Sequence, residues 1–526
     1  MPQTDPLTTL RRQVANATLD LFGAYHPRLY RSDKVVRDVV WGMIDIFPHE
    51  LALIDSPIFQ RLRGVYQTSL ALLTYPCAIH SRFEHSVGAL AVADRVLRAL
   101  ERRADVGITD LDRLEVRLAS LLHDWTHGPL SHTSEAFYKS NPIFPAIRAA
   151  HPLMLGSASA SEILTYCLIT SEPFGHLWEE IVAQYHATRP HGPFLSRCDR
   201  WRIATMIVGA DANTEKPASS PQPENRFLRQ LVNGPFDVDK LDYIARDGYF
   251  TGLNLGIDVD RLLWVMDTIQ VDTDDDRRTR VLCVAASGAT ILEQVVFAKM
   301  QLFSSLYYHH KVRAAHQAAL RLLAGLEEAG IELNGRSLSE PSTFLCLDDY
   351  DVLHGCFQQA KSKKPEPEGL QRARRLAKSI KERNLPMRAL VLAHPAWGSN
   401  PCAASDAERG KWVRKMMEQG QPNRFAAEVA GAAGLSPNDV WVDIPEEVNL
   451  QGTGAEALVK FDDHTFLPIQ DMFPISGWLS AYQLYRMVSY IFAVRDRERV
   501  GRAACEILAR DYDITVSNVA LKLARV

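Results

Sequence analysis

The segment from Leu121 to His132 contains the residue types that a hydrolytic metal centre needs. Its doublet His123-Asp124 places an imidazole beside a carboxylate. These two ligand types suit divalent metals such as Mn, Fe, Mg and Zn. An isolated doublet is weak evidence, because adjacent His and Asp also occur by chance at capped helix ends. The residues around it decide whether it carries chemistry.

Helical patterns surround the doublet. Apolar residues from Val87 to Leu100 recur at roughly helical spacing, which predicts that His85 lies in the first turn of a helix. A second periodic run, from Leu111 to Leu122, carries the doublet at its end, and Gly128-Pro129 stops that run soon after. We therefore expect two helix termini to present three ligands.

The segment 236–247 offers candidates for a fourth ligand. Its carboxylates stand at several spacings, and the sequence alone leaves Asp237 and Asp239 in competition. Two imidazoles and two carboxylates would hold a divalent metal with coordination positions left open. Such a metal polarises a phosphate oxygen and lowers the pKa of a bound water. The residues therefore predict a metal-dependent phosphohydrolase.

A second cluster of candidates follows the doublet and consists of His127, His132 and Glu135. A histidine and a carboxylate three residues apart can share one face of a helix, so that the carboxylate orients and charges the imidazole as a proton donor. We predict a catalytic role for the three residues. The alternative is that both histidines are surface residues after the Gly-Pro break.

Several motifs occur in a fixed order along the chain. They are Asp55–Arg63, Arg82–His85, Leu121–His132, Asp237–Lys240 and Tyr307–Lys311. Over roughly residues 34 to 320, this order resembles the HD-domain deoxynucleoside triphosphate triphosphohydrolases. The resemblance implies an almost wholly helical core, a divalent metal, dNTP substrates and Asp239 as the fourth ligand. The metal set is then His85, His123, Asp124 and Asp239.

The resemblance also implies contacts to the sugar. The family reads the 3′-hydroxyl with a Gln, a Tyr and an Asp, which correspond to Gln67, Tyr243 and Asp247. A further Tyr, which packs where a 2′-hydroxyl would project, corresponds to Tyr308. All four residue types are present, which favours a deoxyribonucleotide substrate. Taken singly, each could equally be a core or surface residue.

Contacts to the phosphates form another part of the prediction. In the family a His and an acidic residue lie beside the scissile phosphate, so His127 and His132 would contact phosphate or protonate the leaving oxygen. Arg82 and Lys240 each stand close to a proposed metal ligand, where they could neutralise a triphosphate. A simple solvated role is the alternative for either cation.

The chain departs from the family pattern at several places, and no clear match for the family's His-Glu pair is found near His151 to Glu162. The Leu and glycine run that follow the Gln in the family are replaced by Thr68-Ser69-Leu70-Ala71, and an Arg before the Tyr is replaced by Met300 with Lys299 adjacent. Base preference and triphosphate contacts therefore stay open. So does a second function, an HD phosphohydrolase acting on nucleoside monophosphates, cyclic nucleotides or alarmones.

The resemblance extends to regulation. Asp55, Gln60 and Arg63 match residues that bind the guanine of an activating nucleotide in a vertebrate relative, and Lys34–Asp38 aligns with an activator-contacting segment. Relatives assemble as tetramers or hexamers, so we expect a homo-oligomer. The alternative is that these three side chains only cap and pair helices.

Composition narrows the class of protein. With 526 residues, 46% hydrophobic and 23% charged, the chain predicts a soluble globular protein of more than one unit. No apolar stretch approaches about 20 residues and no signal peptide is visible, which predicts a cytoplasmic protein without a membrane span. The eight cysteines are scattered, without a zinc pair or a disulfide pattern.

Charge gives little support to nucleic-acid binding. A net charge of −4 offers no global attraction for a polyanion. The basic helix Leu370–Arg383 is the only support for a third function, a nucleotide-binding or nucleic-acid-binding module with vestigial catalysis. Such a stripe is more often a solvated helix face.

The sequence predicts a mainly α fold, namely an HD-domain helical core with a small β-hairpin, followed by an α+β C-terminal region. We expect a helical lead-in over 1–33, the core over 34–330 and the C-terminal region over 331–526. The expected elements are strands at 268–271 and 281–284 with a charged turn between them, helix from 289 to about 329, strands at 389–392 and 440–444, helix over 478–494, and exposed loops at 211–225 and 361–368.

Overall fold

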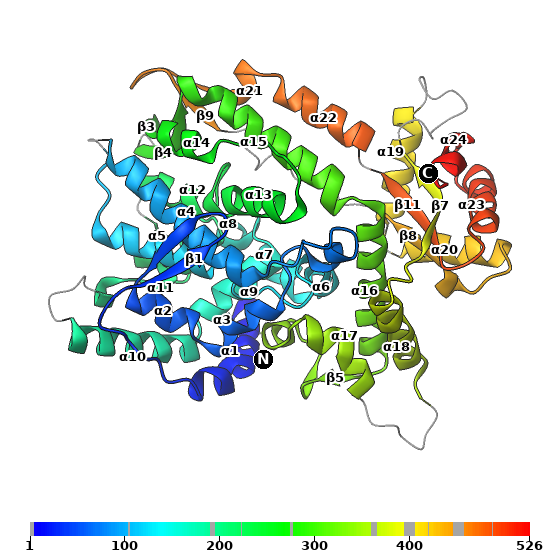
Figure 1. The fold of residues 1–526 in the computed structure, drawn as a ribbon, viewed down its shortest axis with the longest axis horizontal. Helices are drawn as coiled ribbons and strands as arrows, with labels where there is room; N and C mark the ends of the chain where they lie inside the picture. Colours follow the sequence, from blue (N-terminus) through cyan, green and yellow to red (C-terminus); the bar gives the residue numbers. More distant parts are fainter. Residues whose placement is uncertain are drawn as a thin grey trace. The chain divides into compact units, whose positions relative to one another are not determined.

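Helices make up most of the described chain, so the predicted mainly α class is confirmed (Figure 1). The computed structural model describes residues 5–103, 106–189, 195–221, 223–273, 277–358, 366–393, 405–418, 420–444, 457–486 and 488–525. Parts of five predicted segments lie outside these ranges: residues 1–4 of the lead-in, 222 of the first loop, 274–276 of the charged turn, 361–365 of the second loop and 487 of the helix predicted over 478–494.

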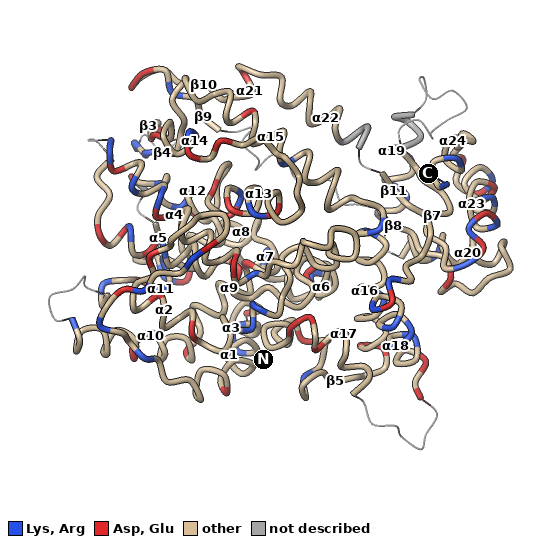
Figure 2. Tube along the Cα trace, viewed as in Figure 1, with Lys and Arg blue, Asp and Glu red and all other residues tan. Residues whose placement is uncertain are grey.

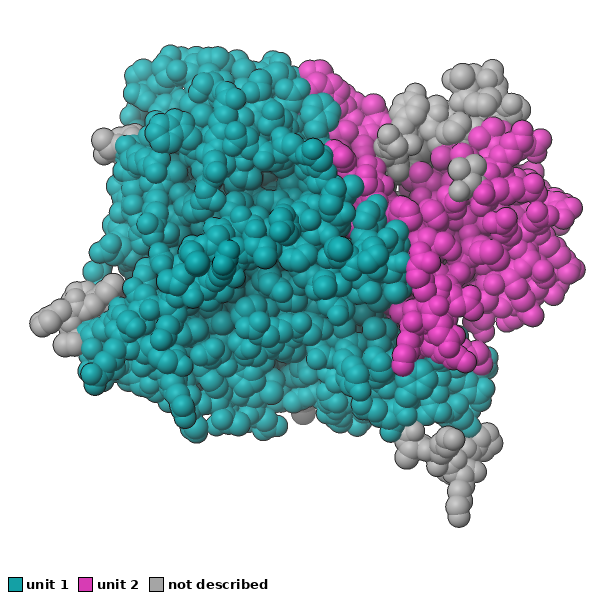
Figure 3. All heavy atoms as spheres, in the orientation of Figure 1, with its two compact units in different colours: residues 1–299, 322–374, 451–473 teal, residues 300–321, 375–450, 474–526 magenta. Residues whose placement is uncertain are grey.

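The chain divides into two compact units that interleave along the sequence (Figure 3). Unit 1 comprises residues 1–299, 322–374 and 451–473, and unit 2 comprises 300–321, 375–450 and 474–526. Each unit therefore draws on both the 34–330 and the 331–526 regions of the sequence.

Three helices of unit 1 position the predicted metal ligands: α4 (Arg82–Glu101), α5 (Asp110–Leu122) and α13 (Val238–Thr251). Helix α4 begins at a capping box, in which Glu84 accepts a hydrogen bond from the Ser81 amide at 2.7 Å. Helix α5 ends at Leu122, and Asp237 caps the N-terminus of α13. Because α4 packs against both other helices, the three termini are held together.

Further helices lie in unit 1. They are α1 (Pro6–Gly23), α2 (Pro48–Ile54), α3 (Pro57–Arg61), α6 (His132–Tyr138), α7 (Ile143–Ala150), α8 (Pro152–Leu155), α9 (Ala160–Ile169), α10 (Glu172–Thr188), α11 (Arg200–Ile207) and α12 (Arg226–Val232). The expected helical lead-in corresponds to α1, which packs on α9 and α10. The predicted loop at 211–225 contains only two short 3-10 turns, Pro217–Ser219 and Pro223–Asn225.

The predicted hairpin is present but belongs to a larger sheet. Strands β3 (Met266–Asp272) and β4 (Arg278–Ala285) pair antiparallel. Strand β9 (Leu458–Lys460) then pairs parallel with β4, and β10 (Phe466–Pro468) completes the order β10-β9-β4-β3. A second hairpin, β1 (Lys34–Asp38) with β2 (Gly42–Ile46), was not predicted.

Further helices follow strand β4 in the chain. They are α15 (Ala289–Leu302), a π turn (Phe303–Tyr307), α16 (His310–Glu328), the 3-10 helix η8 (Pro341–Cys346), α17 (Asp349–Gln358) and α18 (Glu368–Lys381). The expected helix over 289–329 is therefore confirmed except for the π turn. The predicted basic helix corresponds to α18, where Lys and Arg are visible along the tube (Figure 2). Arg372 pairs with Glu328 and Arg374 with Glu366, so part of its charge is neutralised within the chain.

Unit 2 contains a three-stranded antiparallel sheet in the order β7-β11-β8. The predicted strands are β7 (Met387–Leu392) and β8 (Val440–Asp443), and both are confirmed. The helix predicted over 478–494 is wrong in its second half: α22 (Ile475–Arg486) precedes the central strand β11 (Ser489–Ala493). All five residues of β11 are buried, and a continuously apolar run does not distinguish a buried strand from a buried helix.

Helices accompany this sheet in unit 2. They are α19 (Ser405–Met417), α20 (Gln421–Ala432), α23 (Arg497–Asp511) and α24 (Val519–Leu523). The core between helices and sheet includes Leu390, Val442 and Ile491. Helices on an antiparallel sheet agree with the predicted α+β character.

Two absences concern the described residues only. No helix among them is long and apolar enough to cross a membrane. Their seven cysteines are all free, and Cys402 lies outside the described residues.

Candidate metal centre and catalytic loop

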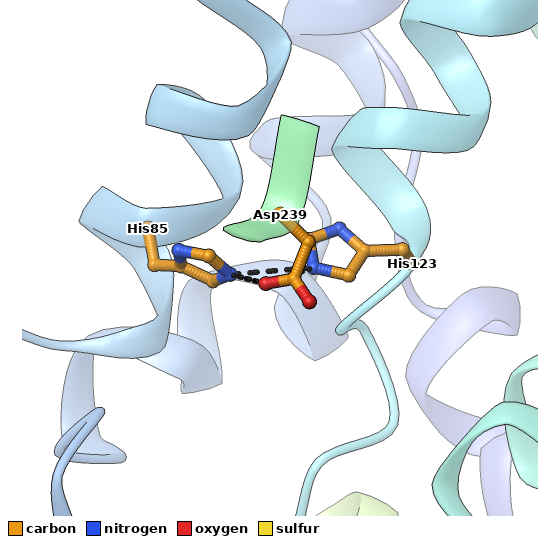
Figure 4. A group of neighbouring side chains, drawn as sticks. All are labelled: His85, His123 and Asp239. Carbon is orange, nitrogen blue, oxygen red and sulfur yellow. Dashed lines mark hydrogen bonds and ion pairs between the residues drawn. The ribbon is translucent and has the colours of Figure 1, made fainter. Parts of the chain in front are cut away.

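Three predicted metal ligands converge at the ends of three helices (Figure 4). His85 Nε2 lies 3.3 Å from His123 Nε2 and 3.1 Å from Asp239 Oδ1. The distance between His123 Nε2 and Asp239 Oδ1 is 3.6 Å. The side chains come from the first turn of α4, the end of α5 and the first turn of α13.

Asp124 adds a second carboxylate. Its Oδ2 lies 3.4 Å from His85 Nε2, and its Oδ1 lies 3.6 Å from His123 Nε2. Ligands at metal bonds of about 2.1 Å stand roughly 3.0 to 3.4 Å apart at adjacent corners of an octahedron or a tetrahedron. The donor set and its spacing therefore fit a divalent metal, whose identity they do not fix.

Neighbouring residues orient both imidazoles toward this cluster. His85 Nδ1 lies 2.7 Å from Asp242 Oδ2, and Asp242 in turn accepts a hydrogen bond from Arg246 Nε at 2.9 Å. His123 Nδ1 lies 2.7 Å from the Ser120 carbonyl oxygen. A proton held on each Nδ1 leaves each Nε2 free to bind a metal. Our sequence analysis missed Asp242, although it stands three residues after Asp239 on the same helix.

Electrostatics favour a cation at this position. Burial lowers the pKa of His85, but hydrogen bonds to Asp239 and Asp242 outweigh it and raise the pKa to about 10. Burial raises the pKa of Asp239, yet the neighbouring His123 and His85 hold it well below its usual range. Without a metal, the carboxylates thus favour the protonated form of His85, and a bound cation can replace its Nε2 proton.

The competing carboxylate has a different role in the structure. Asp237 accepts a hydrogen bond from the Lys240 amide at 2.9 Å and pairs with Lys240 Nζ at 2.5 Å. Lys240 Nζ also donates to the Gly234 carbonyl at 2.8 Å. Asp237 is therefore a helix cap and lysine partner, whereas Asp239 lies with the histidines. The predicted phosphate-binding cation Lys240 is engaged within the chain.

The second predicted cluster also assembles. His132 Nδ1 lies 3.2 Å from Glu135 Oε2, and His127 Nε2 lies 3.8 Å from the same oxygen. Glu135 is fixed by Ser161, whose hydroxyl donates to Oε1 at 2.9 Å. His127 is buried, whereas the His132 side chain is 73% exposed. His132 is thus the member of the cluster that a substrate can reach.

The protonation states of the buried members differ. Burial and the nearby Arg82 lower the pKa of His127. Burial raises the pKa of Glu135, but hydrogen bonds to His132 and Ser161 hold it below its usual range. His127 is therefore neutral at neutral pH, and Glu135 is ionised and able to orient His132.

Arg82 lies between the two clusters. Its guanidinium pairs with Asp124, donates from Nε to Ser131 Oγ at 3.0 Å, and places Nη2 3.3 Å from His132 Nε2. A permanent positive charge at this point disfavours a second metal on the histidine cluster and favours an anionic ligand between the clusters.

Two of the predicted sugar-reading residues meet through a histidine. His80 Nε2 lies 2.8 Å from Asp247 Oδ1, and the His80 carbonyl accepts a hydrogen bond from the Gln67 amide at 3.0 Å. The Oε1 atom of Gln67 is buried without a hydrogen-bond partner among the described residues. Burial and nearby carboxylates raise the pKa of Tyr243, so its phenol stays protonated. His80 received no role in the sequence analysis.

The remaining residue that was predicted to contact the sugar, Tyr308, belongs to unit 2. There its carbonyl accepts a hydrogen bond from the Tyr490 hydroxyl at 3.4 Å, and its ring packs edge-on against Phe303. Its proposed role against a 2′-hydroxyl stays a prediction.

The predicted regulatory residues lie at the surface of unit 1. Arg63 Nε donates to Gln60 Oε1 at 2.8 Å, and the guanidinium stacks 3.5 Å from the centre of the Phe83 ring. Gln60 Nε2 donates to the Ile54 carbonyl at 2.8 Å. Burial raises the pKa of Asp55, and the charge of Arg63 opposes that shift. The structure thus brings Gln60 and Arg63 into direct contact.

The chain is similar to several known proteins. Residues 257–515 match the family described as HD associated region. The chain is 26% identical over 365 residues to the deoxynucleoside triphosphate triphosphohydrolase SAMHD1 homolog of Dictyostelium discoideum, covering 68% of this chain and 60% of the relative. It is 36% identical over 239 residues to SAMHD1 of Gallus gallus, covering 44% and 36%.

An uncharacterized protein of Methanocaldococcus jannaschii is 28% identical over 302 residues, covering 57% of this chain and 51% of that relative. The chain thus spans between 36% and 60% of the length of these curated relatives. The similarity includes proteins whose names state a dNTP triphosphohydrolase activity and proteins without an assigned activity.

Proposed function

We propose, from the premise that this chain is an HD-domain dNTPase-like protein, that it hydrolyses deoxynucleoside triphosphates to deoxynucleoside and inorganic triphosphate. The observation that carries the proposal is the convergence of His85, His123, Asp124 and Asp239 next to the His127, His132 and Glu135 cluster. A metal set beside a proton-transfer set is what hydrolysis of a phosphate ester requires.

The reaction would be water attack at the α-phosphorus. A divalent metal bound by the four ligands would supply Lewis-acid activation of water and of the phosphate. A new P–O bond forms from the water oxygen, and the bond from phosphorus to O5′ breaks. Water loses a proton, and O5′ gains one.

His132 is the group that we assign to protonate O5′. Glu135 is hydrogen-bonded to its Nδ1, so Nε2 is the atom that faces a ligand. Arg82 lies 3.3 Å from that Nε2 and can neutralise a phosphate oxygen placed there. Buried His127, which lies 3.1 Å from Asp124 Oδ1, would hold the carboxylate in place.

The deoxyribose would be read by Gln67, Tyr243 and Asp247. The unpartnered, buried Oε1 of Gln67 supports this assignment, because a buried acceptor without a donor is costly unless a ligand supplies one. Tyr308, which lies in unit 2, is assigned to crowd a 2′-hydroxyl only on the strength of the family resemblance.

Regulation and assembly belong to the same proposal. A nucleotide bound at Asp55, Gln60 and Arg63 would stabilise a homo-oligomer by mass action, and activity would then rise cooperatively with its concentration. Light scattering with and without dNTPs tests this part. A chain that is monomeric at all concentrations and fully active on a single dNTP would refute it.

The proposal is tested by product analysis. The purified chain is incubated with each dNTP, alone and in mixtures, with Mn²⁺ or Mg²⁺, and nucleoside is resolved from phosphates. We expect deoxynucleoside and inorganic triphosphate in equal amounts. Release of monophosphate, or turnover of nucleoside monophosphates or cyclic nucleotides instead, would favour the other HD phosphohydrolase activity.

A further inference from the structure

The loop between Asp124 and His132 has a strained backbone. Leu130 and Ser131 have φ values of 58° and 54°, in the left-handed region that residues with side chains seldom adopt. Both residues are fully buried. Strain of this kind persists only where surrounding contacts hold it, and such contacts often lie near functional sites. The contacts that hold these two residues therefore matter to the loop.

A carboxylate distant in sequence holds the strained residue. Asp349 Oδ1 accepts a hydrogen bond from the Leu130 amide at 2.5 Å. Its Oδ2 accepts one from the Tyr66 amide at 3.1 Å. The Asp349 side chain is buried and uses both oxygens on backbone donors from two segments, so it ties the loop to the strand-like segment that continues into Gln67.

The same two segments contact each other and α4. Ser131 Oγ donates to the Gln67 carbonyl at 2.9 Å and accepts from Arg82. The Arg82 amide donates to the Val65 carbonyl at 2.8 Å. A shift of the loop at Leu130 would therefore move the partners of Arg82 and Gln67 together.

Arg61 holds the other half of the loop. Its guanidinium donates to the carbonyls of His127 at 2.8 Å and Trp125 at 3.2 Å, and to Leu347 at 2.8 Å, two residues before Asp349. Carbonyl oxygens of the loop thus accept hydrogen bonds from the Arg61 guanidinium, and the Leu130 amide donates one to the Asp349 carboxyl group.

Close packing leaves no slack around these contacts. A Cβ added to Gly128 would lie 2.9 Å from Phe344 Cβ, and one added to Gly64 would lie 2.7 Å from Asp348 Oδ2. The segment 341–349 therefore packs so closely that neither glycine could carry a side chain without a shift of its neighbours. It lies within the 257–515 region that matches the HD associated family.

We propose that Asp349 is a positioning residue of the active site, supplied by the HD-associated region to hold the catalytic loop in its strained conformation. The inference rests on the proposed function for its kinetic consequence. Asp349 acts through Leu130 and Ser131 on Arg82 and His132, and it does not touch substrate.

The arrangement depends on a carboxyl group, because each of its two oxygens accepts a backbone hydrogen bond. Asparagine has the same shape but only one acceptor oxygen, so its amide group would face an N–H donor. The charged groups facing Asp349 are Asp348 and Arg61, with opposite effects on its pKa, while burial raises the pKa to about 7. Asp348, by contrast, caps α17 through the Asp351 amide at 3.0 Å.

The test compares Asp349→Asn with Asp348→Asn in the full chain loaded with Mn²⁺. For Asp349→Asn we expect kcat on a dNTP to fall about 10- to 100-fold, as for supporting residues of other sites, with KM and metal content nearly unchanged. Hydrogen exchange at the Leu130 and Tyr66 amides should speed up. The Asp348→Asn chain should keep all four values.

Two results would overturn the inference: a folded Asp349→Asn chain with wild-type kcat and exchange, or an equal loss in Asp348→Asn. If Asp349→Asn does not fold, hydrogen exchange measured in the wild-type chain provides the test. The Leu130 and Tyr66 amides, which donate to the buried carboxylate, should be strongly protected from exchange, and an unprotected Leu130 amide would overturn the inference. Exchange needs no turnover, so a wild-type chain that releases no triphosphate would refute the proposed function while the exchange data still decide on Asp349.

Discussion

The candidate metal cluster and the loop between Asp124 and His132 lie side by side in unit 1 but are built in different ways. His85, His123 and Asp239 come from helix ends and are oriented by nearby partners such as Asp242 on α13. The loop after Asp124 has no regular structure until α6, and its conformation depends on Arg61 and on Asp349, 219 residues after Leu130. The cluster is thus held by local helix geometry, and the loop by long-range contacts.

Because the two regions are held in different ways, we expect substitutions in them to have different effects. Loss of a ligand at the helix ends should remove the metal. Loss of a contact around the loop should leave the metal in place and misalign the groups that move protons and neutralise phosphate. Variants that separate metal content from turnover therefore test the comparison.

The largest effect is expected for Asp239→Ala. Losing a charged ligand removes metal catalysis, which supplies several kcal/mol of barrier reduction, so turnover should fall about 10⁴-fold or more. Elemental analysis should show the metal lost. The matched control is Asp237→Asn, which keeps the helix cap and should keep the metal. If Asp237→Asn loses the metal and Asp239→Ala retains it, the ligand assignment is wrong.

A smaller effect is expected for His132→Gln. Removal of the proposed acid should lower kcat by about 10² to 10³, while metal content stays at the wild-type value because His132 lies outside the ligand set. His176→Gln, an exposed histidine beside Glu172, serves as control and should be fully active. Wild-type kcat in the His132→Gln chain would remove His132 from the mechanism.

Asp242→Asn should weaken metal binding without abolishing it. The change removes the charge that holds the Nδ1 proton of His85, and metal affinity should fall about 10- to 100-fold. Titration with Mn²⁺ measures the affinity, and excess metal should restore most of the turnover. Asp112→Asn, at another buried carboxylate paired with an arginine, should leave the affinity unchanged. An equal loss in both variants would indicate a general effect on folding.

The smallest effect concerns the pH dependence of stability. Burial raises the pKa of Asp349 from 3.8 to about 7, so between these values the folded chain holds a proton that the unfolded chain releases. The group's contribution to the free energy of unfolding is therefore full below about pH 4 and is lost as the pH rises to about 7. Denaturant titrations of Asp349→Asn should show a slope against pH that differs from wild type by at most about one proton. An identical slope would contradict the assigned pKa.

The sequence predicted what local patterns encode. Periodicity located α4 and α5, alternation located β3 and β4, and the spacing of His85, His123-Asp124 and Asp239 selected residues that the structure brings together. Asp237 and Asp239 could not be separated by spacing, because the difference lies in the pairing of Asp237 with Lys240.

Other features of the structure are not indicated by any pattern in the neighbouring sequence. Strand β11 is a short apolar run that is buried throughout, so its sequence also fits a buried helix. Strand β9 pairs with β4 although Leu458 follows its partner Cys283 by 175 residues in the chain. Asp349 contacts Leu130 and Tyr66 only because the chain folds back on itself, and neither its spacing nor its neighbours indicate this.

The central claim is hydrolysis at the α-phosphorus by the metal cluster and His132. Its most direct test is to run the reaction on a dNTP in water enriched in oxygen-18 and to weigh both products. The account predicts one labelled oxygen in the inorganic triphosphate and none in the deoxynucleoside, because the water oxygen bonds to phosphorus and O5′ leaves. Label in the deoxynucleoside, or release of monophosphate and pyrophosphate in place of triphosphate, would contradict it.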